Sequence, residues 1–138
     1  MGAGKVAFKE RKGQLIWPTT GPIKHRFGQR RAQGRLKWNG IVIKNKAGAK
    51  VKAIHGGRVV FSDWLRGYGL LIIIDHGDNY MSLYGHNQSL IKETGDWVNA
   101  GEQISSVGNS GGQSESGLYF EIRKNGKPSN PSRWLPKR

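Results

Sequence analysis

The chain has 138 residues and no cysteine, and 23 Lys and Arg residues against 9 Asp and Glu residues give a formal net charge of +14. This length suits one domain that buries its own core. The lack of cysteine excludes disulfides, thiol catalysis and thiolate metal sites. The mean hydropathy is −0.61, and no apolar run approaches the about 20 residues that cross a bilayer. The positive charge predicts attraction to polyanions, whether nucleic acid, anionic lipid or an acidic cell-wall polymer.

The order of the segments predicts a short basic lead followed by one β domain. Residues 1–14 are polar and basic with little periodicity, so we expect a tether or a cloning remnant there, and the folded domain over 15–138. From Trp38 onward, short β-branched runs alternate with glycines, and no segment has a helical period. Strands are expected near 41–44, 50–54, 57–64, 69–76, 79–86, 103–107 and 117–124. The 21 glycines favour an all-β antiparallel sheet or sandwich.

The last of these strands has two different faces. Its period of two places Leu118, Phe120 and Ile122 on one side, which is typical of a core face. The other side carries Gly117, Tyr119, Glu121 and Arg123. The same period groups Trp38 with Val42, and Tyr84 with His86.

A series of glycine-anchored motifs carries a family resemblance. The motifs are Trp38-Asn-Gly40, Gly48 to Ala53, Gly67-Tyr68-Gly69, Leu83-Tyr84-Gly85-His86, Gly95 to Ile104 and Leu118 to Glu121. Their order and spacing, over roughly residues 17 to 134, resemble those of LytM/lysostaphin-type domains, which are zinc endopeptidases that cut peptidoglycan cross-bridges. The resemblance implies an antiparallel β-sheet domain whose long loops form a groove.

The residues that hold and serve the zinc in that family are mostly replaced here. The family binds zinc with a histidine, an aspartate and a second histidine, and the matching positions carry Trp38, Val42 and Tyr119. Gly117 replaces one catalytic histidine, and only His86 remains. A catalytic zinc needs about three protein ligands, but Trp and Val offer none and a neutral Tyr is a poor one. We therefore expect a degenerate domain with no metal, no cofactor and no hydrolase activity.

In the catalytic family these positions converge on the metal, so we expect them to line a partner-binding groove instead. Apolar and aromatic residues at its base and basic residues at its rim are typical of a protein-binding site. The expected groove residues are Lys37, Trp38, Asn39, Val42, Tyr68, Tyr84, His86, Tyr119 and Arg123. The alternative is that the tyrosines and valine only fill the space of the metal, with His86 a satisfied, half-buried histidine.

Within the family, the chain resembles the non-catalytic amidase activators. The shared segments are Leu36-Lys-Trp38, Asp63-Trp64-Leu65, Ser82 to Gly85 and Ser116 to Arg123. The retained His86 is a departure from that group. The resemblance implies a periplasmic, non-enzymatic activator of N-acetylmuramoyl-L-alanine amidases, which relieves their autoinhibition so that septal peptidoglycan is split during cell division. It also implies a link to the FtsEX membrane complex through an upstream region outside these residues.

Two rival functions remain open. A passive peptidoglycan- or polyanion-binding module is favoured by the charge and by the Arg30-Arg31 loop. An active peptidoglycan endopeptidase would need a zinc site rebuilt from His25, His55 and His76. Nucleic acid is not expected as a partner, because the basic residues are scattered and no aromatic stacking platform accompanies them.

One further motif is misleading. Gly108-Asn109-Ser110-Gly111-Gly112 is similar to the nucleophile loop of trypsin-like serine proteases. That reaction needs a histidine base, an aspartate that orients it and an oxyanion hole. The chain is too short for the double barrel that supplies them, so we interpret the segment as a glycine-rich turn before the last long strand.

Overall fold

The computed structural model describes residues 6–31 and 34–137. In this part the chain forms strands, loops and two short 3-10 helices, η1 (Phe8–Arg11) and η2 (Pro131–Arg133), and the expected all-β class is confirmed. None of its helices is long and apolar enough to span a bilayer. The strands are β1 (Ile23–His25), β2 (Arg30–Arg31), β3 (Leu36–Lys37), β4 (Ile41–Lys44), β5 (Lys50–Lys52), β6 (Gly57–Leu65), β7 (Gly69–Gly77), β8 (Tyr80–Leu90), β9 (Trp97–Val98), β10 (Gln103–Val107), β11 (Gly117–Lys124) and β12 (Lys127–Ser129).

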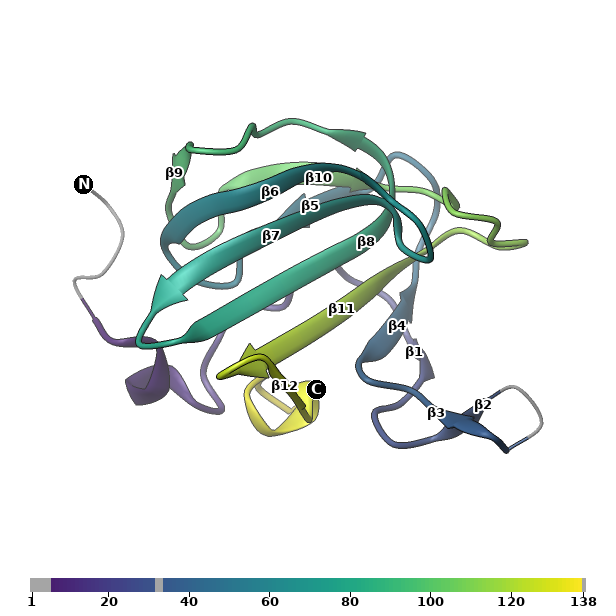
Figure 1. The fold of residues 1–138 in the computed structure, drawn as a ribbon, viewed down its shortest axis with the longest axis horizontal. Coiled ribbons are helices and arrows are strands. Elements are labelled where there is room, and N and C mark those ends of the chain that lie inside the picture. Colours follow the sequence, from purple (N-terminus) through teal and green to yellow (C-terminus); the bar gives the residue numbers. More distant parts are fainter. Residues whose placement is uncertain (1–5, 32–33, 138) are drawn as a thin grey trace.

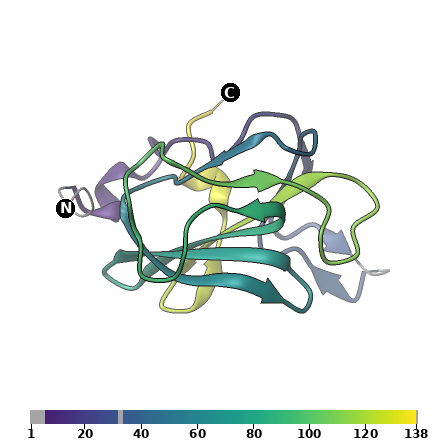
Figure 2. The ribbon, with the colours of Figure 1, turned by 90° about the horizontal axis from the view of Figure 1, so that it is seen from above.

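Ten of these strands form one antiparallel sheet, whose main path runs β1-β4-β11-β8-β7-β6-β9 (Figure 1). Strand β8 connects the two layers of the fold. Most of it lies between β7 and β11, whereas its last residues, 87–90, pair with β10, which in turn pairs with β5. The second view shows the resulting layers, with β6 and β7 in one and β10 in the other (Figure 2). The apolar core fills the space between them.

The seven expected strands are all present, with ends that differ by a few residues. The largest difference is β8, which continues to Leu90 because its end crosses to the second layer. The sequence did not predict β1, β2, β3, β9 and β12. Each has only two or three residues, which is too short for an alternating pattern to be recognised.

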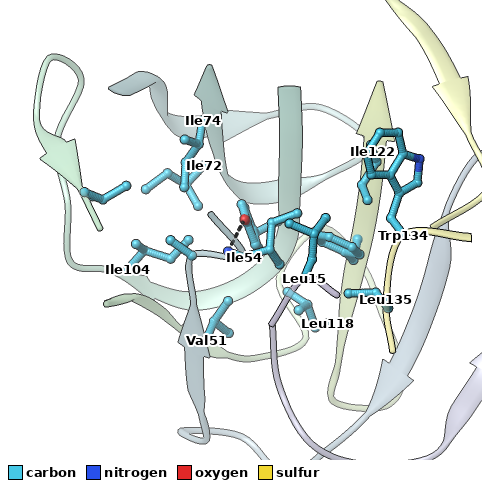
Figure 3. Close-up of a cluster of buried hydrophobic side chains, with 14 of the residues drawn as sticks. Leu15, Val51, Ile54, Ile72, Ile74, Ile104, Leu118, Ile122, Trp134 and Leu135 are labelled. Carbon is cyan, nitrogen blue, oxygen red and sulfur yellow. Dashed lines mark hydrogen bonds between the residues drawn. The ribbon is translucent and has the colours of Figure 1, made fainter. Parts of the chain in front are cut away.

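The core draws side chains from both layers and from both ends of the described chain (Figure 3). Ile72, Ile74, Leu118 and Ile122 come from the long strands. Leu15 comes from the N-terminal segment, and Trp134 and Leu135 from the C-terminal one. All seven are at most 5% exposed.

The N-terminal segment differs from the tether expected over residues 1–14. Phe8 in η1 is 1% exposed and belongs to the core. Its ring stacks on His76 at 4.7 Å between centroids and lies 4.8 Å from Trp134. The folded part therefore begins before residue 15, while residues 1–5 lie outside the described ones. A single apolar residue in a basic stretch has no periodicity, so its burial could not be recognised from the sequence.

A chain of polar groups crosses the core beneath Phe8. Nδ1 of His76 lies 2.8 Å from the carbonyl oxygen of Gly56, which can only accept, so the neutral ring carries its proton on Nδ1. Nε2 lies 2.7 Å from Oγ of Ser82, whose hydroxyl is 2.8 Å from that of Tyr84. The Tyr84 hydroxyl accepts a hydrogen bond from the backbone amide of Ile54 (Figure 3). Burial lowers the pKa of His76 to about 3.

This arrangement predicts that acid destabilises the fold through His76. Between pH 6.5 and about 3 the unfolded chain binds a proton that the folded chain does not, so stability is complete above pH 6.5 and falls as the pH decreases. Through His76 alone, the free energy of unfolding should fall by about 1.4 kcal/mol for each pH unit in this range. Urea unfolding at pH 5, 6 and 7 should show that His76→Gln removes most of this slope. The control His25→Gln should retain it, and equal slopes in His76→Gln and the parent would contradict the assignment.

Candidate partner-binding groove

Tyr119 is the residue around which the expected groove residues gather. It lies in β11, between β4 and β8, with Val42 as its cross-strand partner on one side and Gly85 on the other. Three aromatic rings surround it, with centroids 5.8 Å away for Tyr68, 6.0 Å for His86 and 6.1 Å for Trp38. The structure therefore brings together Trp38, Val42 and Tyr119, the positions where the family resemblance implies zinc ligands.

A buried carboxylate holds Tyr119 in place from below. Glu121, two residues along the same face of β11, is 0% exposed. It accepts a hydrogen bond from the Tyr119 hydroxyl, and a second from Nε of Arg123 at 2.7 Å. Burial, followed by the nearby Glu121 charge, raises the pKa of both Tyr119 and Tyr68. Both phenols therefore stay protonated at neutral pH, and Tyr119 can donate to the carboxylate.

Gly40 permits this packing. A Cβ atom at that position would lie 2.3 Å from the carbonyl oxygen of Phe120 and 2.8 Å from Cγ of Glu121. These distances are too short for any side chain, so only glycine lets the chain cross over Glu121 and lead Trp38 towards Tyr119.

Tyr84 was expected in the groove, and this prediction is wrong. Its side chain is 0% exposed in the core, where it lies across from Phe120. The expectation assumed that Tyr84 and His86 share a face of a regular strand. The register between β7 and β8 shifts near this point, and His86 has a φ of 61°, so the alternation of side chains breaks between the two residues. Gly85 takes the place beside Tyr119.

His86 does lie at the groove. Its Nδ1 is 2.8 Å from the carbonyl oxygen of Ser110, which fixes the proton of the neutral ring on that nitrogen. Burial lowers its pKa, so the ring is neutral near pH 7.

The protease-like loop at Ser110 has a structural role, as expected from its glycines. The Ser110 hydroxyl donates to the carbonyl of Asn87 at 2.6 Å and accepts from the amide of Leu70 at 3.0 Å. A Cβ at Gly111 would lie 2.6 Å from the amide nitrogen of Gly69. The loop therefore locks the bend in β8 to the β6–β7 hairpin.

One wall of the groove contains His25 and Arg31, which the sequence analysis did not assign to the groove. The ring of His25, in β1, stacks on Trp38 at 4.5 Å and 14°, and the guanidinium carbon of Arg31 lies 3.6 Å from the centre of the Trp38 ring. Both contacts join segments whose pairing depends on the β2–β3 hairpin, so no local pattern indicates them. The only available signal was the density of basic residues in this loop.

The opposite wall is the loop before β11. Glu115 in this loop pairs with Lys24 of β1 at 2.9 Å. Figures 1 and 2 both place this loop and the β2–β3 hairpin at the same end of the molecule. Between them is a hollow of about 350 Å³ that is lined by Lys24, His25, Arg31, Trp38, Val42, His86 and residues 113–117.

The remaining expected residues lie at the edge of this site. Arg123 is partly exposed next to Glu121, while Lys37 and Asn39 are exposed on either side of Trp38. Their role in binding a partner stays a prediction.

The donor set does not fit a zinc ion. Trp38, Val42 and Tyr119 meet where the ligands are expected, and the part of the chain that the structure describes has no group of three or more His, Cys, Asp or Glu side chains that could hold a metal. His55 and His76 are neighbours, with ring centroids 5.8 Å apart, but each has a backbone carbonyl as a partner beneath η1. His25 lies in the groove wall, away from this pair.

Known proteins share both the sequence and the fold. The murein hydrolase activator EnvC of Escherichia coli K12 is 51% identical over 124 residues, which cover 90% of this chain and 29% of that protein. The murein hydrolase activator NlpD of the same organism is 43% identical over 123 residues, with 88% and 31% covered. This chain thus spans about a third of the length of these relatives.

Solved structures of peptidases have the same fold. A putative M23 peptidase from Pseudomonas aeruginosa superposes with a TM-score of 0.81 at 19% identity, over 98% of this chain and 54% of that one. The catalytic domain of lysostaphin from Staphylococcus simulans gives 0.72 at 23% identity, over 80% and 89%. The model of peptidase family M23 matches residues 36–131. The chain therefore belongs to peptidase family M23, the LytM family that its motifs resemble.

Proposed function

We propose that this domain is a non-enzymatic activator of N-acetylmuramoyl-L-alanine amidases. The observation that supports the proposal is the cluster of Trp38, Tyr68 and His86 around Tyr119, which includes two positions where the family resemblance implies zinc ligands. The names of the relatives EnvC and NlpD, murein hydrolase activators, support this class of function. In this proposal the domain acts in the periplasm, where it promotes the splitting of septal peptidoglycan.

The groove has the composition of a site that binds a protein segment. The rings of His25, Trp38 and His86 line its hollow together with Arg31, whose guanidinium group lies over the Trp38 ring. Trp, Tyr and Arg are the residues that most often carry binding energy at protein interfaces. A helix or extended segment of the amidase could insert an apolar anchor against Val42 and Tyr119. The net charge of +14 favours acidic residues beside that anchor.

Activation would follow if the segment that the groove binds is the one that keeps the amidase inactive. We propose that the groove captures the amidase segment that blocks the amidase's own active site. Binding shifts the amidase towards its open state only if the groove binds that state more tightly than the closed state. Each tenfold change in the open population requires a difference of about 1.4 kcal/mol in binding free energy. No bond is made or broken in this domain, so the chemistry remains entirely with the amidase.

Dye release from labelled peptidoglycan tests the proposal directly. The domain alone should release no dye, with or without added zinc, because the groove has no ligand set for the metal. The amidase alone should be slow, and both together should release far more than the sum. Zinc-dependent release by the domain alone would establish the endopeptidase alternative. Wall binding with no effect on any amidase would establish the passive module.

Truncation of Trp38 should weaken activation without unfolding the domain. As a central anchor, Trp38→Ala is expected to cost ~2 kcal/mol of binding, which is roughly 30-fold in affinity. Trp97→Ala is the matched control, since Trp97 is 50% exposed on β9, at the far edge of the sheet. Titration of the amidase with each variant measures the effect. Equal activation by the two variants would exclude the groove as the docking site.

Tyr119→Phe separates the ring of Tyr119 from its hydroxyl. The substitution removes a hydrogen bond to the buried Glu121 carboxylate, so urea unfolding should show a loss of ~1–3 kcal/mol. Activation of the amidase should persist, because the ring that packs against Trp38, Tyr68 and His86 is retained. Tyr80→Phe serves as a control, since no bond of the Tyr80 hydroxyl is found among the described residues, and it should change stability far less. Lost activation at unchanged stability would mean that the hydroxyl contacts the partner instead.

A further inference from the structure

Two hollows lie outside the groove, and each is lined in part by a residue of η2. One, of about 570 Å³, is lined by Phe27, residues 124–125 and 127–130, and Arg133. The other, of about 580 Å³, is lined by Trp17, residues 22–23, Arg26, Ser132 and residues 135–137. Their linings include two pairs of residues that are adjacent in the sequence: Arg26 with Phe27, and Ser132 with Arg133. We call them together the η2 cleft, and neither shares a lining residue with the hollow of the groove.

The η2 cleft is lined by cations, and in the part of the chain that the structure describes none of them forms an ion pair with a carboxylate. Its charged residues are Arg26, Lys124, Lys127, Arg133 and Lys137. The three ion pairs found among the described residues involve cations outside this cleft. No described Asp or Glu lines the cleft. Lys124 is fixed in place, since its Nζ donates to the carbonyl of Asp78 and lies 4.1 Å from the Tyr80 ring. The cleft therefore favours an anion.

Uncharged donors and aromatic rings accompany these cations. Ser129 Oγ accepts from the indole of Trp134 at 3.3 Å, which leaves its own proton to donate. Asn130 uses its carbonyl oxygen to accept from the amide of Ser132, which leaves its NH₂ group available among the described residues. The rings of Phe27 and Trp17 are partly exposed in the two hollows. Hydroxyl and amide donors beside aromatic faces suit sugar rings, and guanidinium and ammonium groups suit carboxylates.

We propose that the η2 cleft binds an acidic glycan, a sugar polymer with carboxylate groups. The identity of this polymer as peptidoglycan rests on the proposed function: its stem peptides carry free carboxylates, and its muramic acid carboxylate is free where the stem peptide has been removed. The cleft and the groove are separate, so the domain holds the wall with one surface and the amidase with the other.

Co-sedimentation with purified peptidoglycan tests this second site. The variant Lys127→Glu/Arg133→Glu reverses two exposed charges of the cleft and should weaken wall binding by about tenfold or more. The variant Lys46→Glu/Lys52→Glu makes the same change of net charge at exposed positions outside all three hollows. It should weaken binding by less than about twofold. Equal losses in the two variants would show attraction by net charge alone and would overturn the site.

Small probes test the chemistry of the ligand. N-acetylmuramic acid should shift the backbone amide resonances of Phe27, Ser129 and Asn130 in NMR titrations. N-acetylglucosamine, which lacks the carboxylate, and inorganic phosphate, which lacks the sugar, should shift them far less. Phe27→Leu should reduce the response to N-acetylmuramic acid, because it removes the flat ring and keeps an apolar side chain. An equal response to phosphate would overturn the assignment to a glycan in favour of a general anion site.

The two sites can be told apart in one further measurement. On soluble wall fragments, the variant Lys127→Glu/Arg133→Glu should stimulate the amidase as the parent does, because the groove is intact. Loss of both wall binding and stimulation in this folded variant would overturn the separation of cleft and groove. If the parent stimulates no amidase, the proposed function fails, while the co-sedimentation result still decides whether the cleft binds the wall.

Discussion

The groove depends on one buried carboxylate. Glu121 has no exposed surface, and its charge is compensated by the Tyr119 hydroxyl and by Arg123. Loss of either partner would leave a buried charge less compensated, which destabilises the fold. The two partners are therefore held on one face of β11, and the absence of a Cβ at Gly40 keeps the neighbouring chain close above them. Trp38, Tyr68 and His86 pack around a ring whose position is already fixed, so the groove is preformed.

The parts of this site that the sequence predicted came from the family resemblance, and the period of two assigned their faces. Trp38 lies in the loop before β4, Val42 in β4 and Tyr119 in β11. Val42 and Tyr119 are cross-strand partners, and the period of two places Trp38 on the same face. The prediction for Tyr84 was wrong because a shift of one residue exchanges the faces of a strand. That shift is caused by contacts from outside β8, including the Ser110 loop that bonds to Asn87 and Leu70. A local pattern does not contain such contacts.

Residues that act over long sequence distances were missed for a related reason. Phe8 packs on Trp134, and Lys24 pairs with Glu115. Each contact is made only after the sheet has brought its two segments together. His25 and Arg31 lie in strands of three and two residues, where no period exists to show which side chain faces Trp38. The family resemblance locates the site, but the walls of the site follow from these loop contacts.

The separation of the groove from the η2 cleft has a consequence for how an activator works on an insoluble substrate. The Arg26–Phe27 turn directly follows β1, whose His25 stacks on Trp38, so one short segment contributes to both surfaces. A rigid connection of this kind lets a wall-bound domain keep its groove accessible. An amidase held in that groove is then confined close to its substrate, and its effective concentration at the wall increases without any new contact to the glycan. If both proposals hold, activation on intact wall combines relief of autoinhibition at the groove with localisation at the cleft, and soluble fragments report only the first.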